Sequence, residues 1–188
     1  MSDADNGATP AVRTVKPAAA RVLPLAASGW RWLPLAAAII VADQLVKAWI
    51  THHFSLFERV HVLKVLDIIL TYNTGAAFSF LSQASGWQRW LFVVLAAAVA
   101  TALLVWMRRL DARVHGLLAC GLALIVGGAL GNMLDRLTIG RVVDFIHVHW
   151  GRAYFPAFNV ADSAITIGAL VLLIDAWRET RAAKRLRP

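Results

Sequence analysis

Four long apolar runs alternate with polar and charged segments along the chain. Each run contains 18 to 20 residues, and together they cover 32–50, 90–107, 116–134 and about 158–177. At about 1.5 Å of rise per residue, each run forms a helix long enough to cross the roughly 30 Å hydrocarbon core of a bilayer. Backbone groups in lipid must pair with one another, which favours helices for such runs. The pattern therefore predicts four transmembrane helices.

The two longer connecting segments, 51–89 and 138–157, show the alternation that is typical of short strands. Residues 61–65 and 68–72 are strand-like and are followed by a turn at Asn73-Thr74-Gly75, and residues 142–146 are strand-like as well. We expect these stretches to form a small sheet. The predicted fold class is an all-α membrane protein with four transmembrane helices and a small extracytoplasmic β cradle.

The remaining segments form two tails. Residues 1–31 are rich in Ala, Pro and basic residues, and their apolar stretch is too short for the core of a signal peptide. Residues 178–188 are strongly basic. We therefore expect a membrane domain at 32–177 between two cytoplasmic tails.

Composition narrows the class further. Of 188 residues, 59% are hydrophobic and 16% are charged, against about 45–50% and 25% in average soluble domains. This balance argues against both a soluble domain and a disordered chain. The single cysteine, Cys120, excludes a disulfide within the chain and any metal site built from cysteines.

The net charge is +8, and the distribution of the basic residues along the chain indicates how the helices are oriented in the membrane. Most basic residues lie in the two tails and in the connection between the second and third runs, which share one side of a four-span path. Positive residues mark the cytoplasmic side, so we expect both termini in the cytoplasm and the cradle outside. We expect anionic membrane lipids as partners, and no nucleic acid.

Polar residues within the runs gather near the outer surface. Asp43 lies about 10 Å below the outer end of the first run, and Asp162 lies about 6 Å inside the fourth. Asn132, Asp135 and Arg136 end the third run at the same side. An ionisable residue inside a span costs about 2.5–3.5 kcal/mol, so each needs a partner or a function.

Neighbours in the sequence separate these acids into two groups. Lys47 is one turn from Asp43, and Arg136 follows Asp135, so we expect these carboxylates to brace the bundle through ion pairs.

Asp144 and Asp162 have no such basic neighbour. Arg141 lies three residues before Asp144 but would point to the opposite face of a strand, and no basic residue lies within one helical turn of Asp162. Two carboxylates that meet in a partly dry site share one proton and can hydrolyse an amide by acid–base chemistry. A hydrogen-bonded structural Asp162 and a solvated Asp144 remain the alternatives.

Three other functions compete with amide hydrolysis. A small carrier could use buried carboxylates for protons or cations, but such sites usually lie near the midplane. A non-catalytic scaffold would not need the costly outer cluster. A zinc site could use His147 and His149, with His52 and His53 on the same side, but His-Glu-x-x-His and cysteine ligands are absent from the sequence. We expect no metal, and interface polarity or a mild pH response for these histidines.

Five motifs, in order, resemble those of the bacterial lipoprotein signal peptidases (signal peptidase II). They are Asp43-Gln44-Leu45-Val46-Lys47, Asn73-Thr74-Gly75-Ala76-Ala77-Phe78-Ser79, Gly131-Asn132-Met133-Leu134-Asp135-Arg136, Val142-Val143-Asp144-Phe145 and Phe158-Asn159-Val160-Ala161-Asp162-Ser163-Ala164-Ile165. Each is short, but five at plausible spacing and on the expected side are highly specific.

The resemblance implies that Asp144 and Asp162 form the catalytic pair, in agreement with the choice made from their neighbours. It also implies supporting or substrate-binding roles for the other polar and small residues of the motifs: Asp43, Lys47, Asn73, Gly75, Asn132, Asp135, Arg136 and Asn159. The long N-terminal tail and His147-Val148-His149-Trp150 depart from the family pattern.

The function implied by the resemblance is removal of signal peptides from diacylglyceryl-modified bacterial prolipoproteins, with the cut just before the lipidated cysteine. The enzyme is expected in the cytoplasmic (inner) membrane, as a monomer, with its active site near the periplasmic face. No cofactor is required for this chemistry.

Overall fold

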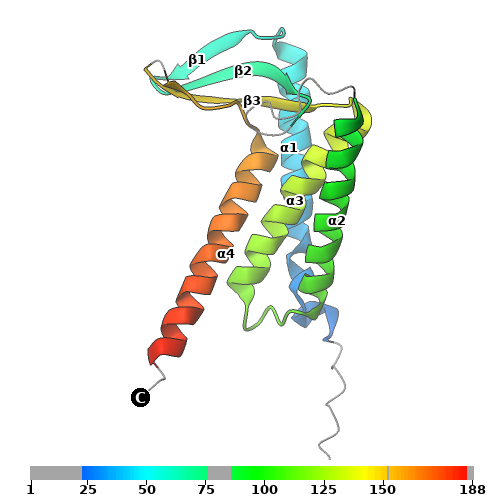
Figure 1. Ribbon diagram of the computed structural model, residues 1–188, viewed down its shortest axis with the longest axis vertical. Coiled ribbons are helices and arrows are strands. Elements are labelled where there is room, and N and C mark those ends of the chain that lie inside the picture. Colours follow the sequence, from blue (N-terminus) through cyan, green and yellow to red (C-terminus); the bar gives the residue numbers. More distant parts are fainter. Residues whose placement is uncertain (1–22, 76–85, 152, 186–188) are drawn as a thin grey trace, which may run out of the picture.

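The computed structural model describes residues 23–75, 86–151 and 153–185. Within them, four helices are long and apolar enough to cross a membrane: α1 (Leu33–His53), α2 (Trp87–Arg109), α3 (Gly116–Thr138) and α4 (Val160–Arg185). A small antiparallel sheet lies at one end of these helices (Figure 1). The predicted fold class, four spanning helices with a small sheet, is therefore confirmed.

The helices continue past the apolar runs. Two short 3-10 helices, η1 (Leu25–Ala27) and η2 (Gly29–Trp32), lead into α1, which has Pro34 in its first turn. Proline is well tolerated there, because the first N–H groups of a helix have no partner within it. At the other end of the chain, α4 extends to Arg185, so most of the basic tail is helical. Basic side chains in a last turn interact favourably with the helix dipole.

The sheet has the order β1-β2-β3-β4, and every pair is antiparallel. Its strands are β1 (Arg59–Leu63), β2 (Leu66–Asn73), β3 (Val142–Trp150) and β4 (Ala153–Tyr154). The first predicted strand was misplaced at its end, because residues 64–65 form the turn between β1 and β2. Pairing of β2 with β3 places Thr71 opposite Asp144, which joins the two connecting segments.

Helix α3 lies at the centre of the bundle and packs against the other three helices. Two neighbouring glycines allow this close approach. A Cβ on Gly127 would lie 2.8 Å from the carbonyl oxygen of Ala36 on α1, and one on Gly128 would lie 2.3 Å from that of Ala161 on α4. These two glycines of α3 therefore serve two different helix interfaces.

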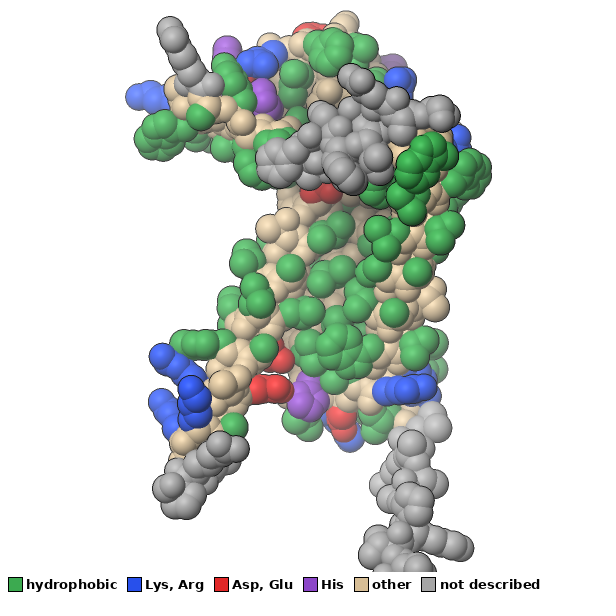
Figure 2. Space-filling model, in the orientation of Figure 1, with side chains coloured by type: hydrophobic (Ala, Val, Ile, Leu, Met, Phe, Trp, Pro, Cys, Tyr) green, Lys and Arg blue, Asp and Glu red, His purple; other side chains and the backbone are tan. Residues whose placement is uncertain are grey.

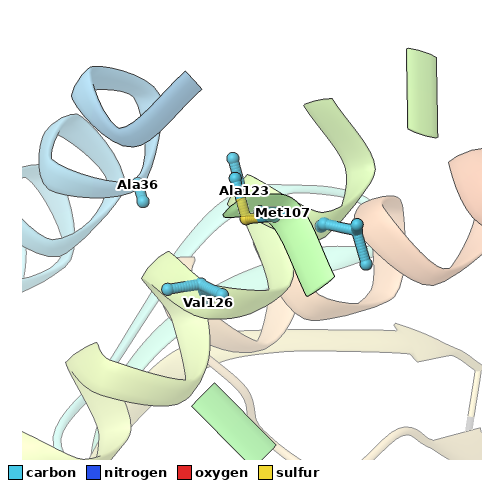
Figure 3. Packing of buried hydrophobic residues seen from close by; sticks show 5 residues of the cluster. Ala36, Met107, Ala123 and Val126 are labelled. Atoms are coloured by element: carbon cyan, nitrogen blue, oxygen red, sulfur yellow. The ribbon is translucent and has the colours of Figure 1, made fainter. Parts of the chain in front are cut away.

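Two apolar clusters stabilise the described residues. Ala36, Met107, Ala123 and Val126 pack between α1, α2 and α3 (Figure 3). A second cluster beneath the sheet joins α1 to β2 and β3 through Ile50, Leu70, Val143 and Phe145. This second cluster anchors β3, and therefore Asp144, to the top of the bundle.

Much of the helical surface is apolar and exposed, as expected for helices that face lipid. Examples are Val94 and Leu95 on α2 and Leu170 and Leu173 on α4. Figure 2 shows hydrophobic side chains over the middle of the molecule, while most charged side chains lie toward its two ends.

Candidate active site

Asp162 is held in the first turn of α4 by a reciprocal cap. The backbone N–H of Asp162 donates to Asn159 Oδ1 (2.9 Å), and the N–H of Asn159 donates to Asp162 Oδ2 (3.2 Å). This is the capping-box arrangement, with Asp in the place of Glu. The second carboxylate oxygen, Oδ1, accepts from Asn132 Nδ2 on α3 at 2.7 Å. Both oxygens of Asp162 are therefore fixed in direction.

Asp144 lies on β3 and is buried. Its Oδ1 accepts a hydrogen bond from Asn159 Nδ2 at 2.8 Å, and Asn73 on β2 also bonds to its side chain. The same Asn159 amide contacts Val143 O and Asn132 Oδ1, each at 3.1 Å. Asn159 thus bonds to both acids, through its backbone and side chain, and ties them to α3.

Both carboxylates open onto one cavity of about 1010 Å³. The cavity runs from the sheet along the first turns of α4 and is lined by residues of both, mostly apolar or uncharged: Phe57, Arg59, Ile69, Thr71, Tyr72, Asn73, Thr74, Asp144, His147, Tyr154, Phe155, Pro156, Ala157, Phe158, Asp162, Ser163, Ile165, Thr166 and Ile167. The structure therefore brings together two acids that are 18 residues apart in the sequence.

The cavity changes the acidity of Asp144. Burial, followed by the nearby charge of Asp162, raises its pKa from 3.8 to about 7, although hydrogen bonds from Asn73 and Asn159 oppose the shift. At neutral pH this carboxyl is therefore poised between its charged and protonated forms, which suits a group that must exchange a proton during catalysis.

A buried lysine organises the acids on the other side of Asn132. Lys47 Nζ lies 2.7 Å from Asp43 Oδ2 and 2.9 Å from Asp135 Oδ2, and it donates to Asn132 Oδ1 at 3.0 Å. The second oxygen of Asp43 accepts from the N–H of Ala161 at the start of α4 (2.9 Å). The predicted bracing pair of Asp43 and Lys47 is present, and it extends to three helices.

Asp135 has different partners from the one predicted. Its Oδ2 binds Lys47 and accepts from the N–H of Val143 (3.1 Å), whereas Arg136 donates to Gly75 O (3.1 Å) and Asn132 O (3.4 Å). The guanidinium of Arg136 also lies 4.9 Å from the ring centroid of Phe92. The prediction of an Asp135–Arg136 pair was wrong, because successive residues of a helix do not face each other.

The Asn73 motif is only partly described. Asn73 Oδ1 accepts from the N–H of Gly75 at 2.9 Å, which closes a turn at the end of β2. This turn places Gly75 O within reach of Arg136. Residues 76–79 of the motif lie outside the described residues.

Gln44 is the main polar contact that sequence reasoning missed. Its Nε2 donates to Asp135 Oδ1 (2.8 Å), and it also contacts Gly131 O (3.3 Å) and Asp43 Oδ2 (3.2 Å). The available signal was its position beside Asp43 within a polar motif of a spanning helix. The cavity-lining residues of β4 and of the segment that follows it carried no comparable signal.

Four spanning helices, with the buried Asp144 of β3 and the partly buried Asp162 of α4 facing one cavity, are what a membrane-embedded peptidase of the aspartic type requires. Comparison with known proteins specifies the family. The family model described as Signal peptidase (SPase) II matches residues 35–178. The chain belongs to the signal peptidase II family.

Relatives and solved structures agree with this family. A lipoprotein signal peptidase of Ectopseudomonas mendocina is 50% identical over 155 residues, which are 81% of this chain and 91% of that protein. One from Shewanella sp. (strain MR-4) is 46% identical and covers 82% and 91%. A structure described as a bacterial membrane enzyme, determined by the in meso method, aligns with a TM-score of 0.70 and 31% identity over 80% of this chain and 90% of its own. These matches do not favour the carrier alternative.

Proposed function

We propose that this protein removes signal peptides from diacylglyceryl-modified bacterial prolipoproteins, cutting before the lipidated cysteine, and that Asp144 and Asp162 are its catalytic residues. The observation that carries the proposal is the convergence of the buried Asp144 and the partly buried Asp162 on one cavity, where Asn159 bonds to both. The names of the relatives support the substrate class.

The mechanism follows from one proton shared between two carboxyl groups. The charged carboxylate accepts a proton from a water molecule as the water oxygen attacks the carbonyl carbon of the scissile amide. The protonated carboxyl donates its proton to the carbonyl oxygen, giving a tetrahedral diol. Collapse of the diol breaks the C–N bond: the proton taken from water passes to the leaving nitrogen, and the second carboxylate takes back a hydroxyl proton of the diol, which leaves the new carboxylic acid and restores the shared proton.

Asn132 and Asn159 position the acids. Lys47 donates to Asn132 Oδ1, which requires the Nδ2 group of Asn132 to face Asp162. Asn159 similarly receives the N–H of Asp162 on Oδ1 and directs Nδ2 toward Asp144. Lys47 is therefore a positioning residue, because it orients the side-chain amide of Asn132, which in turn orients the carboxylate of Asp162.

The shape of the cavity supports a substrate that is part peptide and part membrane-embedded. At the sheet end, an extended peptide could add alongside the strands of the cradle. At the helix end, the lining includes Ile165, Thr166 and Ile167, and Ile167 is half exposed on the apolar side of α4. A signal helix and acyl chains in the bilayer would approach along this side of α4.

The orientation belongs to the same proposal. The described C-terminal end of α4 lies opposite the sheet (Figure 1), and basic residues end α2 and α4 there: Arg108, Arg109, Lys184 and Arg185. Since positive residues favour the cytoplasmic side, we place both termini in the cytoplasm and the cavity near the periplasmic face of the inner membrane. We also propose that the protein acts as a monomer.

A defined cleavage assay tests the proposal. The purified protein is reconstituted in vesicles with a diacylglyceryl-modified precursor peptide, and the products are identified by mass spectrometry. Asp144→Asn and Asp162→Asn are each expected to reduce cleavage by about 10²–10⁴-fold, the usual contribution of acid–base catalysis. Asp175→Asn, at the opposite end of α4, is the matched control. A cut elsewhere in the peptide, or full activity of either variant, contradicts the proposal.

A further inference from the structure

Three neighbouring strands of the sheet bring an imidazole, a carboxylate and a second imidazole together. His61 on β1 pairs across the strands with Asp67 on β2, and His149 lies on β3. One possible ligand atom from each of these residues lies within 4.8 Å of the other two. We call this group the His61–Asp67–His149 cluster. It contains neither of the proposed catalytic acids.

The distances within the cluster are short. His61 Nδ1 lies 2.5 Å from Asp67 Oδ1, and His149 Nε2 lies 3.3 Å from the same oxygen. The Asp67 side chain has no exposed surface, and that of His149 is only 14% exposed, whereas that of His61 is 76% exposed. The cluster is therefore a buried carboxylate and a mostly buried imidazole with one exposed imidazole beside them.

Buried polar atoms in the cluster lack hydrogen bonds. Within the described residues, both ring nitrogens of His149, Nδ1 and Nε2, are buried and have no hydrogen-bond partner. Buried polar atoms are normally satisfied, and a bound ion is one way in which such atoms are completed. The cluster is thus incomplete as a set of hydrogen-bonding groups.

We propose that the His61–Asp67–His149 cluster binds one divalent transition-metal ion, for which Zn²⁺ is the probe of choice. Two imidazoles and one carboxylate are a common ligand set for zinc. With metal–ligand bonds of about 2.0–2.2 Å, tetrahedral ligands lie roughly 3.3 Å apart. Small rotations of the exposed His61 ring would produce such spacing, and a recess lined by both His61 and His149 adjoins the cluster.

A positive side chain, that of Arg59, contacts the carboxylate of this site. Arg59 Nη1 lies 3.6 Å from Asp67 Oδ2, and the same guanidinium lies 5.3 Å from the ring centroid of Tyr154. Arg59 therefore occupies one side of the carboxylate and leaves Oδ1, which faces both imidazoles, for the ion. Its charge weakens cation binding but neutralises the second oxygen, so the ion needs only one carboxylate oxygen.

The ion would join strands that also form the wall of the catalytic cavity. Side chains two residues apart on a strand share a face. Arg59, Ile69 and His147 line that cavity, and each is two residues from a member of the cluster. Binding would therefore tie the exposed edge strand β1 to β2 and β3 beside the cavity, and should raise thermal stability.

The sequence alone did not indicate this site. It suggested His147 as the partner of His149, but the His147 ring stacks on Tyr154 with centroids 5.2 Å apart. The other two members come from the β1–β2 hairpin, far from His149 in the sequence. Only the strand register places them together.

Zinc titration of the full chain tests the proposal independently of peptidase activity. The protein is purified with a histidine-free tag, stripped with chelator, and titrated with ZnCl₂ by calorimetry. We expect one ion per chain and binding that is at least about tenfold weaker in His61→Gln and His149→Gln. The control is the His52→Gln/His53→Gln double variant, whose imidazoles lie at the end of α1, and it should bind as the wild type does.

Melting temperatures without metal show whether each variant is folded. His61 is exposed, so His61→Gln decides the question even if His149→Gln unfolds. X-ray absorption at the zinc edge should show two imidazoles and oxygen ligands. Failure of the wild type to bind zinc, unchanged binding in His61→Gln, or loss of binding in the control would overturn the proposal.

Discussion

Replacement of Asp144 by Asn should make the protein more stable at alkaline pH. The carboxyl of Asp144 is buried beside Asp162, and its pKa is raised from 3.8 to about 7. The folded state therefore holds this proton more tightly than the unfolded state does. The resulting stabilisation is complete below the unfolded pKa and is lost as pH rises through the folded pKa. An Asn side chain at position 144 has nearly the same shape as Asp but cannot ionise, so the variant does not lose this stability.

The size of the Asp144 pKa shift determines how much folding stability the wild type loses as pH rises. At about 1.4 kcal/mol per pKa unit, full ionisation of the buried group costs roughly 4 kcal/mol. Most of this cost falls between pH 5 and pH 8, where the wild type should lose about 3 kcal/mol relative to Asp144→Asn. For a chain of this length, 1 kcal/mol corresponds to roughly 2–4 °C in melting temperature. The difference in melting temperature between Asp144→Asn and the wild type, which we call the gap, should therefore widen by about 6–12 °C from pH 5 to pH 8.

Thermal unfolding in detergent at pH 5, 6, 7 and 8 measures this gap. Asp111→Asn is the control, because hydrogen bonds from Arg113 lower the pKa of Asp111 to about 2 and its charge is constant over this range. The reasoning is refuted if the gap between Asp144→Asn and the wild type stays constant with pH, or if it widens equally for Asp111→Asn.

Two further predictions concern packing and the buried ion network. Lys47→Met leaves Asp43 and Asp135 buried without their cation and should destabilise the fold by about 3–5 kcal/mol. Its control, Lys64→Met in the exposed β1–β2 turn, should change stability by less than about 0.5 kcal/mol. Equal melting temperatures for the two variants would contradict this prediction. Gly128→Ala places a Cβ 2.3 Å from a carbonyl oxygen of α4 and should cost about 1–3 kcal/mol, whereas Gly116→Ala has open space around its Cβ and should unfold at the wild-type temperature or above.

The spanning helices were readable from the sequence because lipid imposes long apolar runs. Asp144 and Asp162 were identified by elimination, since neither has a base one turn away. The partner of Asp135 was not readable, because Lys47 reaches it from another helix. The same applies to the Asn159 amide, whose contacts on α3 and β3 depend on how α4 packs.

The register of the sheet was the hardest feature to predict. Alternation indicated strands in both connecting segments, but it did not specify which residues lie opposite each other. The position of Asp67 between two histidines therefore emerged only from the paired strands. Patterns over a few residues predicted the helices and strands, whereas contacts between residues far apart in the sequence became known only from the folded structure.

Cleavage as proposed here depends on the joint action of Asp144 and Asp162 as one catalytic unit. The most direct test of this claim is the rate constant for cleavage of the lipidated precursor peptide by the wild type, Asp144→Asn, Asp162→Asn and the double variant, under single-turnover conditions. Residues that act as a unit are strongly non-additive, so all three variants should share the same low residual rate. A double variant slower by the product of the two single effects, or a single variant with near-normal rate, would contradict the claim.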